Sequence, residues 1–215
     1  SGHLARRIGK TLMKWRRKIM ILNILLFDDF ETLDVFGPVE VFGNLPKDYE
    51  LRYLSMEGGI VKSRHGVKVL TEALESFSPD GIIFIPGGYG VRPLVGDPAY
   101  VEMVKGLCEK SQFCLTVCTG SALLAKTGLL KGLLATSNKL SFDWVVSMDP
   151  GVDWQSMARW AVHGKYWTSS GVSAGIDMAL AFVEKANGRD EAERVARFME
   201  YIWNEDNDND PFEIG

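Results

Sequence analysis

Cys118 is the residue of this sequence best placed for covalent chemistry. It follows the apolar run FCLTV (residues 113–117), which predicts a buried strand, and it precedes a predicted helix at residues 121–130. At a helix N-terminus, unpaired amide groups and the helix dipole favour a thiolate and lower the cysteine pKa. Because Gly120 and Ser121 are small, the turn can be sharp. The sequence therefore predicts a nucleophile elbow with Cys118 at its tip.

Groups that could assist such a nucleophile follow two other predicted strands. Gly87 and Gly88 end the run IIFIP, and their lack of side chains allows backbone amides to approach a ligand closely. With the amide of Thr119, they could stabilise a developing anion. Asp34 stands between Leu33 and Val35, where a carboxylate must find a partner or shift its pKa upward. It is a candidate acid–base group, although capping of the following helix is an equally open interpretation.

The remaining cysteines and histidines are predicted to have structural roles. Cys108 lies in a helical pattern and Cys114 lies within a strand pattern, which favours small core residues over chemistry. His65 and His163 stand at predicted hairpin turns, so a Cys–His pair is not expected. The sequence predicts neither a metal site nor a cofactor, since the three cysteines have no second cluster to complete a zinc site.

Composition points to small molecules as partners. The 215 residues are 46% hydrophobic and 24% charged, with a net charge of −4, which gives no general attraction to nucleic acid. The longest apolar run, residues 19–27, is too short to cross a membrane. Unpaired cysteines favour a cytoplasmic protein. Residues 1–18 are interpreted as a basic extension or tag remnant, and a mitochondrial location is the alternative if they are native.

Strands and helices alternate along the rest of the chain, which is expected to form one domain over residues 19–215. Alternation of this kind predicts an α/β fold with an open, mostly parallel sheet and helices on both faces. The predicted strands cover residues 19–27, 49–55, 81–88 and 113–117, with hairpins at 61–70 and 159–169. The predicted helices cover residues 33–45, 98–110, 121–130, 174–187 and 189–204. In such sheets ligands bind beyond the carboxyl ends of the strands, where Asp34, Gly87 and Cys118 all lie.

Four segments in order resemble the DJ-1/ThiJ/PfpI superfamily of flavodoxin-like proteins, which is related to class I glutamine amidotransferases. They are LDVFGPVEVF (33–42), IFIPGGYG (83–90), TVCTGSALLAKTGLLKG (116–132) and SSGVSAGIDMALAFVE (169–184). The aspartate before the Gly-Pro pair, together with CTGS and GxxAGID, is similar to the isocyanide-hydratase branch. The PfpI peptidase branch typically has glutamate at the first site and a Cys–His pair.

The resemblance implies roles for individual residues. Cys118 would be the nucleophile, Asp34 the carboxylate near its sulfur, and Gly88 and Thr119 the backbone donors, with the Thr119 hydroxyl as a further contact. Many relatives have a histidine where this chain has Asn138. Because an amide cannot shuttle a proton, chemistry that requires a Cys–His pair is disfavoured, and Asn138 becomes a possible pocket residue.

Three functions are compatible with this set of residues. The leading one is a cysteine-nucleophile lyase or hydrolase acting on a small electrophile, with isocyanide hydration to an N-formamide as the sharpest form. The second is a glyoxalase or deglycase acting on reactive carbonyls. The third is a redox-sensing or chaperone-like protein in which Cys118 is oxidised. A homodimer is also expected, since the family is usually dimeric and the helix at 33–45 carries extra apolar residues at Val35, Phe36, Val39 and Phe42.

Overall fold

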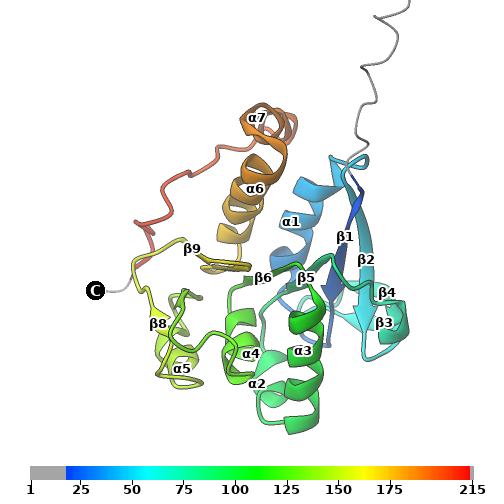
Figure 1. Ribbon diagram of the computed structural model, residues 1–215, viewed down its shortest axis with the longest axis vertical. Coiled ribbons are helices and arrows are strands. Elements are labelled where there is room, and N and C mark those ends of the chain that lie inside the picture. Colours follow the sequence, from blue (N-terminus) through cyan, green and yellow to red (C-terminus); the bar gives the residue numbers. More distant parts are fainter. Residues whose placement is uncertain (1–17, 214–215) are drawn as a thin grey trace, which may run out of the picture.

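An eight-stranded sheet organises the chain. The computed structural model describes residues 18–213, so the interpretation of residues 1–18 as an extension concerns a segment outside the described residues, apart from Lys18. The strand order is β3-β4-β2-β1-β5-β6-β10-β9 (Figure 1). The strands are β1 Met20–Leu25, β2 Tyr49–Ser55, β3 Glu57–Lys62, β4 Lys68–Ala73, β5 Ile82–Ile85, β6 Phe113–Val117, β9 Trp160–His163 and β10 Tyr166–Ser169.

The core of the sheet is parallel, as the sequence predicts. β2, β1, β5, β6 and β10 pair in parallel, whereas the edge strands β3 and β9 pair antiparallel with β4 and β10. This core has the order of flavodoxin-like sheets, in which the chain winds outward from β1 in both directions. The point where the winding direction changes lies between β1 and β5, so the loops after these strands form the expected ligand crevice.

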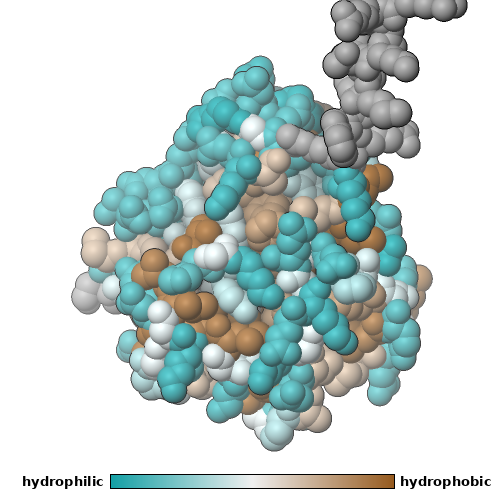
Figure 2. All heavy atoms as spheres, viewed as in Figure 1, coloured by the Kyte–Doolittle hydropathy of each residue, from teal (hydrophilic) through white to brown (hydrophobic). Residues whose placement is uncertain are grey.

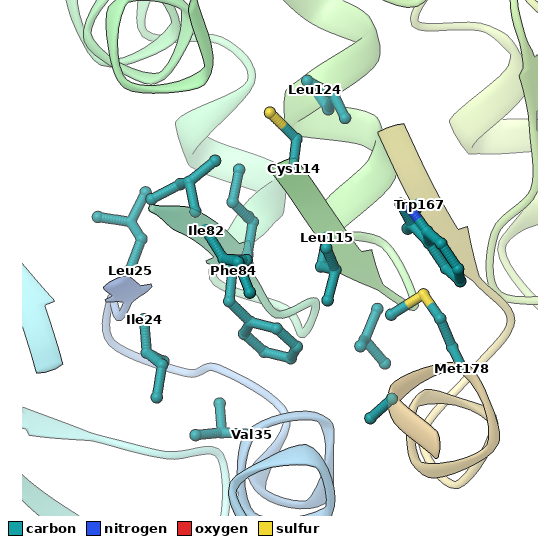
Figure 3. Close-up of a cluster of buried hydrophobic side chains, with 14 of the residues drawn as sticks. Ile24, Leu25, Val35, Ile82, Phe84, Cys114, Leu115, Leu124, Trp167 and Met178 are labelled. Carbon is teal, nitrogen blue, oxygen red and sulfur yellow. The ribbon is translucent and has the colours of Figure 1, made fainter. Parts of the chain in front are cut away.

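Helices cover both faces of the sheet. On one face α1 (Thr32–Gly43) packs against α6 (Ala174–Asn187), which is followed by α7 (Arg189–Phe198). The short α2 (Val91–Leu94), α3 (Pro98–Lys110) and α4 (Gly120–Lys126) pack together on the other face (Figure 1). Apolar side chains fill the space between these layers, with Phe84, Leu115 and Met178 among the buried ones (Figure 3).

One polar residue lies in the middle of this apolar core. Asn23 interrupts the apolar run of β1 and is fully buried. Its Nδ2 donates to the carbonyls of Ser78 and Ile82, at 2.9 and 3.1 Å, while its Oδ1 accepts from the Ser78 amide at 3.0 Å. Because both ends of the amide are satisfied, a central strand can contain it at little cost.

Two predicted helices are shorter in the structure than in the sequence pattern. α4 ends at Lys126, because the chain turns at Gly128, where φ is 82°. α7 ends at Phe198, ahead of Glu200 with a φ of 50°. The pattern also missed short elements between the longer ones, namely η1 Leu74–Ser76, β7 Leu134–Ala135, α5 Phe142–Val146 and β8 Asp153–Trp154.

A buried ion pair explains why the chain leaves the α7 helix. Asp177 of α6 accepts from Arg159 Nε at 2.7 Å, from the Tyr201 hydroxyl at 3.0 Å and from the Asn204 amide at 2.9 Å. Burial is the largest influence on this carboxyl and raises its pKa, while these donors act in the opposite direction. The aspartate of the AGID segment therefore fixes the C-terminal segment to the body of the protein.

No helix within residues 18–213 has the length and apolar character needed to span a membrane.

Candidate active site

Cys118 occupies a strained turn between β6 and α4, as the elbow prediction requires. Its φ of 57° lies in the left-handed region, which is uncommon for a residue with a side chain. Three hydrogen bonds hold this geometry. The Cys118 carbonyl accepts from the hydroxyls of Ser121 and Ser137, at 3.1 and 2.9 Å, and its amide donates to the Ser170 carbonyl at 3.2 Å. The surrounding structure thus fixes a conformation that the residue would rarely adopt alone.

Close packing of the elbow depends on Gly120. A Cβ at this position would collide with the carbonyl oxygen of Ile85 and would lie 2.8 Å from that of Pro86, both of which are backbone atoms of the neighbouring strand end. Helix α4 can begin at this point only because the side chain is absent.

Gly120→Ala is therefore expected to destabilise the protein, although alanine is the better helix former by roughly 1 kcal/mol. Gly106, within α3, provides the matched control, because a Cβ added there would meet only open space. Gly106→Ala should raise the free energy of unfolding by up to about 1 kcal/mol. Urea unfolding of the two variants should give changes of opposite sign, and an equal stabilisation by both would contradict the packing argument.

Asp34 is fully buried and points at the elbow. Its Oδ2 accepts from the Gly87 amide at 2.8 Å, which joins the first turn of α1 to the loop after β5. Helix α1 begins at Thr32, and its N-cap residue is Glu31, without a side-chain capping bond. The interpretation of Asp34 as a helix cap is therefore wrong, because the residue lies inside the first turn and its carboxylate bonds across the chain.

Burial raises the pKa of both Asp34 and Cys118. It raises the pKa of Asp34 to about 7, against the opposing effects of the Gly87 amide, the Cys118 side chain and the Val172 amide. The pKa of Cys118 is also raised, mainly by burial and then by the charge of Asp34. The prediction of an acid-shifted Cys118 is thus wrong for the free site. Burial and a facing carboxylate outweigh the seven-residue helix behind the sulfur.

Three donors nevertheless favour negative charge on the sulfur. The amides of Thr119 and Val172 and the side chain of Asn138 all lower the Cys118 pKa. Asn138 Oδ1 accepts from the Ser141 amide at 3.0 Å, which orients the side chain so that its Nδ2 is the donor left for the sulfur. Asn138, which the resemblance implied as a possible pocket residue, therefore lies beside the nucleophile, and it can donate to a thiolate without exchanging a proton.

The two glycines after β5 already have acceptors for their amides. The Gly87 amide is bound to Asp34, and the Gly88 amide donates to Thr119 Oγ1 at 3.0 Å. A Cβ at Gly87 would lie 2.5 Å from the Thr119 amide nitrogen and 2.9 Å from the Cys118 Cβ. The glycines therefore allow the loop to touch the elbow, and the Thr119 hydroxyl helps to fix that contact.

A cavity of about 230 Å³ opens above these groups. Cys118, Thr119, Gly88, Asn138 and Val172 form one part of its wall. The rest was not predicted from the sequence and is formed by Glu31, Arg64, Tyr89, Arg92, Leu140 and Ser141. Of these, Tyr89 stands in the IFIPGGYG segment, which was the available signal, whereas nothing in the pattern around Arg64 places it at the crevice.

Among residues 18–213, the other cysteines and the two histidines do not join this site. Cys108 and Cys114 are fully buried, and the Cys114 thiol donates to the Cys108 carbonyl at 3.6 Å, in the apolar core shown in Figure 3. His65 Nδ1 lies 2.7 Å from the Thr32 hydroxyl, and His163 Nδ1 accepts from the Leu134 amide, so neither lines the cavity. Within residues 18–213, no three His, Cys, Asp or Glu side chains gather in a way that could hold a metal ion.

Comparison with known proteins identifies the family. The model of the DJ-1/PfpI family matches residues 18–185. An isonitrile hydratase from Pseudomonas putida is 30% identical over 181 residues, which are 84% of this chain and 78% of that protein. The deglycase PfpI from Pyrococcus furiosus is 26% identical over 156 residues, which are 71% of this chain and 89% of that protein.

Solved structures agree with the fold. A ThiJ/PfpI family protein from Pseudomonas syringae superposes with a TM-score of 0.79 at 24% identity, covering 97% of this chain and 84% of the other. The motifs, the strand order and these matches all lead to the same assignment: the chain belongs to the DJ-1/PfpI family.

Proposed function

We propose that the protein is an enzyme in which Cys118 attacks a small electrophilic molecule and Asp34 accepts the thiol proton. The observation that carries this proposal is the proximity of the two buried side chains: each influences the pKa of the other, the pKa of Asp34 is raised to about 7, and Asp34 Oδ1 has no hydrogen-bond partner among residues 18–213. A general base is most effective when its pKa is close to the working pH. Because the thiol is protonated in the free site, proton transfer to Asp34 would accompany attack by the sulfur.

Isocyanide hydration is the reaction that we propose first. The sulfur of Cys118 forms a bond to the terminal isocyanide carbon, and the thiol proton passes through Asp34 to the same carbon, which gives a thioimidate. Water then adds to that carbon, and Asp34 takes a proton from the water and passes it to the nitrogen. Collapse of the tetrahedral intermediate breaks the carbon–sulfur bond, transfers the hydroxyl proton through Asp34 to sulfur and releases the N-formamide. The sum is one isocyanide and one water converted to one formamide.

Two observations support this choice. The relative with 30% identity is an isonitrile hydratase, and its match covers most of both chains. Asn138, and not a histidine, lies beside the sulfur in the cavity wall. This suits a mechanism in which a carboxylate is the group that transfers protons. Incubation with an aliphatic isocyanide should yield the formamide, measured by chromatography against Cys118→Ser as the blank. No formamide above that blank would overturn the proposal.

A reactive carbonyl is the second candidate substrate, because a deglycase matches 71% of this chain. The same sulfur would add to the carbonyl carbon to give a hemithioacetal, and methylglyoxal would yield lactate. Parallel assays for lactate and formamide distinguish the two activities.

The redox-sensing alternative is less well supported, because susceptibility to oxidation follows thiolate character and the Cys118 pKa is raised.

We also propose a homodimer, on the family resemblance, and a cytoplasmic location, on the unpaired cysteines. The added argument from α1 does not hold, because Val35 and Phe42 are fully buried and Phe36 and Val39 are half-buried against the same core. Exposed apolar side chains occur elsewhere. Ile60 and Leu70 face each other across the β3–β4 hairpin and are 63% and 76% exposed. Apolar patches also interrupt the mostly hydrophilic face shown in Figure 2. Sedimentation as a monomer at micromolar concentration would contradict the dimer.

A further inference from the structure

Two arginines form part of the cavity wall above Cys118. Arg64 follows the hairpin strand β3, and Arg92 belongs to the short helix α2. They differ in their surroundings. Arg64 Nη1 lies 3.2 Å from Glu31 Oε2, and its guanidinium lies 4.7 Å from the centroid of the Tyr89 ring. The positive charge of Arg64 is therefore balanced by a carboxylate of the same wall.

Within residues 18–213, no carboxylate balances the positive charge of Arg92 in this way. Its guanidinium lies 4.2 Å from the centroid of the Trp144 ring, and its one hydrogen bond within the described part of the chain is to Ser141 Oγ at 3.5 Å, the limit of such a bond. Among residues 18–213, no carboxylate lies within ion-pair distance of Arg92. Stacking on an indole ring fixes the plane of a guanidinium while leaving its N–H edge available to a ligand. Arg92 thus presents an unpaired cation at the mouth of the cavity.

We propose that the substrate is a small monoanion, whose carboxylate binds Arg92 while its electrophilic carbon reaches Cys118. This inference rests on the proposed function and narrows its substrate class to isocyano acids. The cavity of about 230 Å³ admits only a small molecule. One unpaired arginine matches one negative charge, because the charges of Arg64 and Glu31 on the same wall balance each other. The planar fork of arginine fits the two oxygens of a carboxylate.

Two thiol reagents of nearly equal size test the charge preference directly. Iodoacetate carries a carboxylate and iodoacetamide a neutral amide. The rate of alkylation of Cys118 by iodoacetate, divided by the rate with iodoacetamide, therefore reports the charge preference of the cavity. The thiolate fraction cancels in this ratio. Arg92→Gln should lower the ratio about tenfold, the usual scale of one charge-assisted hydrogen bond. Added salt should lower the wild-type ratio, because Arg92 is exposed.

Two variants serve as comparisons. Arg197→Gln removes the same charge from the exposed end of α7, outside the cavity wall, and should leave the ratio within about twofold, since screening weakens distant charges. Glu31→Gln should raise the ratio, because it removes a negative charge from the wall. If Arg92→Gln changes the ratio no more than Arg197→Gln does, the proposal is overturned.

Substrate assays connect this result to turnover. Wild type should prefer isocyanoacetate over its ethyl ester, and Arg92→Gln should raise KM for the acid while sparing the neutral ester. The two proposals fail separately. A ratio that depends on Arg92, without turnover of any of these compounds, would support the anion site and reject the enzymatic function. Turnover with equal preference for acid and ester in both proteins would reject the anion site alone.

Discussion

Cys118→Ser is expected to reduce turnover at least about 1,000-fold, the scale seen when a nucleophile is removed. A serine hydroxyl holds its proton far more tightly than a thiol does. Asp34, with its pKa at about 7, is too weak a base to remove that proton. Serine has nearly the same shape and can keep the backbone contacts of the elbow, so the variant should remain folded. Steady-state rates on the best isocyanide or carbonyl substrate give the measurement.

The other two cysteines are the natural controls. Cys108 and Cys114 are fully buried in the core, away from the cavity. Cys108→Ser and Cys114→Ser place a hydroxyl among apolar side chains, so they should lower the melting temperature and leave the rate per folded molecule nearly unchanged. If Cys118→Ser kept more than a tenth of the activity, or if Cys114→Ser abolished it, the assignment of the nucleophile would fail.

Asp34→Asn is expected to have two effects of opposite sign. Turnover should fall about 100-fold to 10,000-fold, because an amide of the same shape cannot accept the thiol proton. Stability at neutral pH should rise, because a buried group that resists ionisation is replaced by one that never ionises. The amide oxygen can still accept from Gly87, which keeps the link between the first turn of α1 and the loop after β5.

The gain in stability should depend on pH in a defined direction. The folded pKa of Asp34 is about 7, above the value of about 3.9 for an unfolded chain. At low pH both states are protonated, and the substitution should have little effect. As the pH rises between these two pKa values, Asp34 loses its proton in the unfolded wild type but keeps it in the folded one. The folded wild type is thereby destabilised by an amount on the order of a few kcal/mol.

Urea unfolding of both proteins at acidic and at mildly alkaline pH tests this dependence. The difference in unfolding free energy should widen from acid to alkali. An equal difference at both pH values would show that folding does not raise the pKa of Asp34. Less than about a threefold drop in turnover would show that it does not act as the acid–base group.

The position of the site could be predicted from the sequence, but its electrostatics could not. Apolar runs that end at Asp28, Pro86 and Cys118 mark the carboxyl ends of β1, β5 and β6, and the rules of parallel sheets bring such ends together. The pKa of Cys118 depends instead on how deeply the sulfur is buried and on Asp34, which lies 84 positions earlier in the chain. The residues next to Cys118 in the sequence indicate neither how deeply its sulfur is buried nor that Asp34 lies beside it.

The arginines of the wall illustrate the same limit. Arg64 reaches the cavity through the β3–β4 hairpin, and Arg92 reaches it through a helix of four residues. Neither has a periodic pattern that predicts which way the side chain points. Asn138 was identified only by its place in the family motif, and its contact with the sulfur follows from a loop held by the Ser141 amide.

The pH dependence of kcat/KM for one substrate, in wild type and in Asp34→Asn, tests the Cys118–Asp34 pair most directly. If Asp34 is the base that takes the thiol proton, kcat/KM of the wild type should rise with pH to a plateau, with an apparent pKa about 7. The residual activity of Asp34→Asn should lack that inflection. A wild-type profile that is flat across neutral pH, or the same inflection in both proteins, would contradict the account.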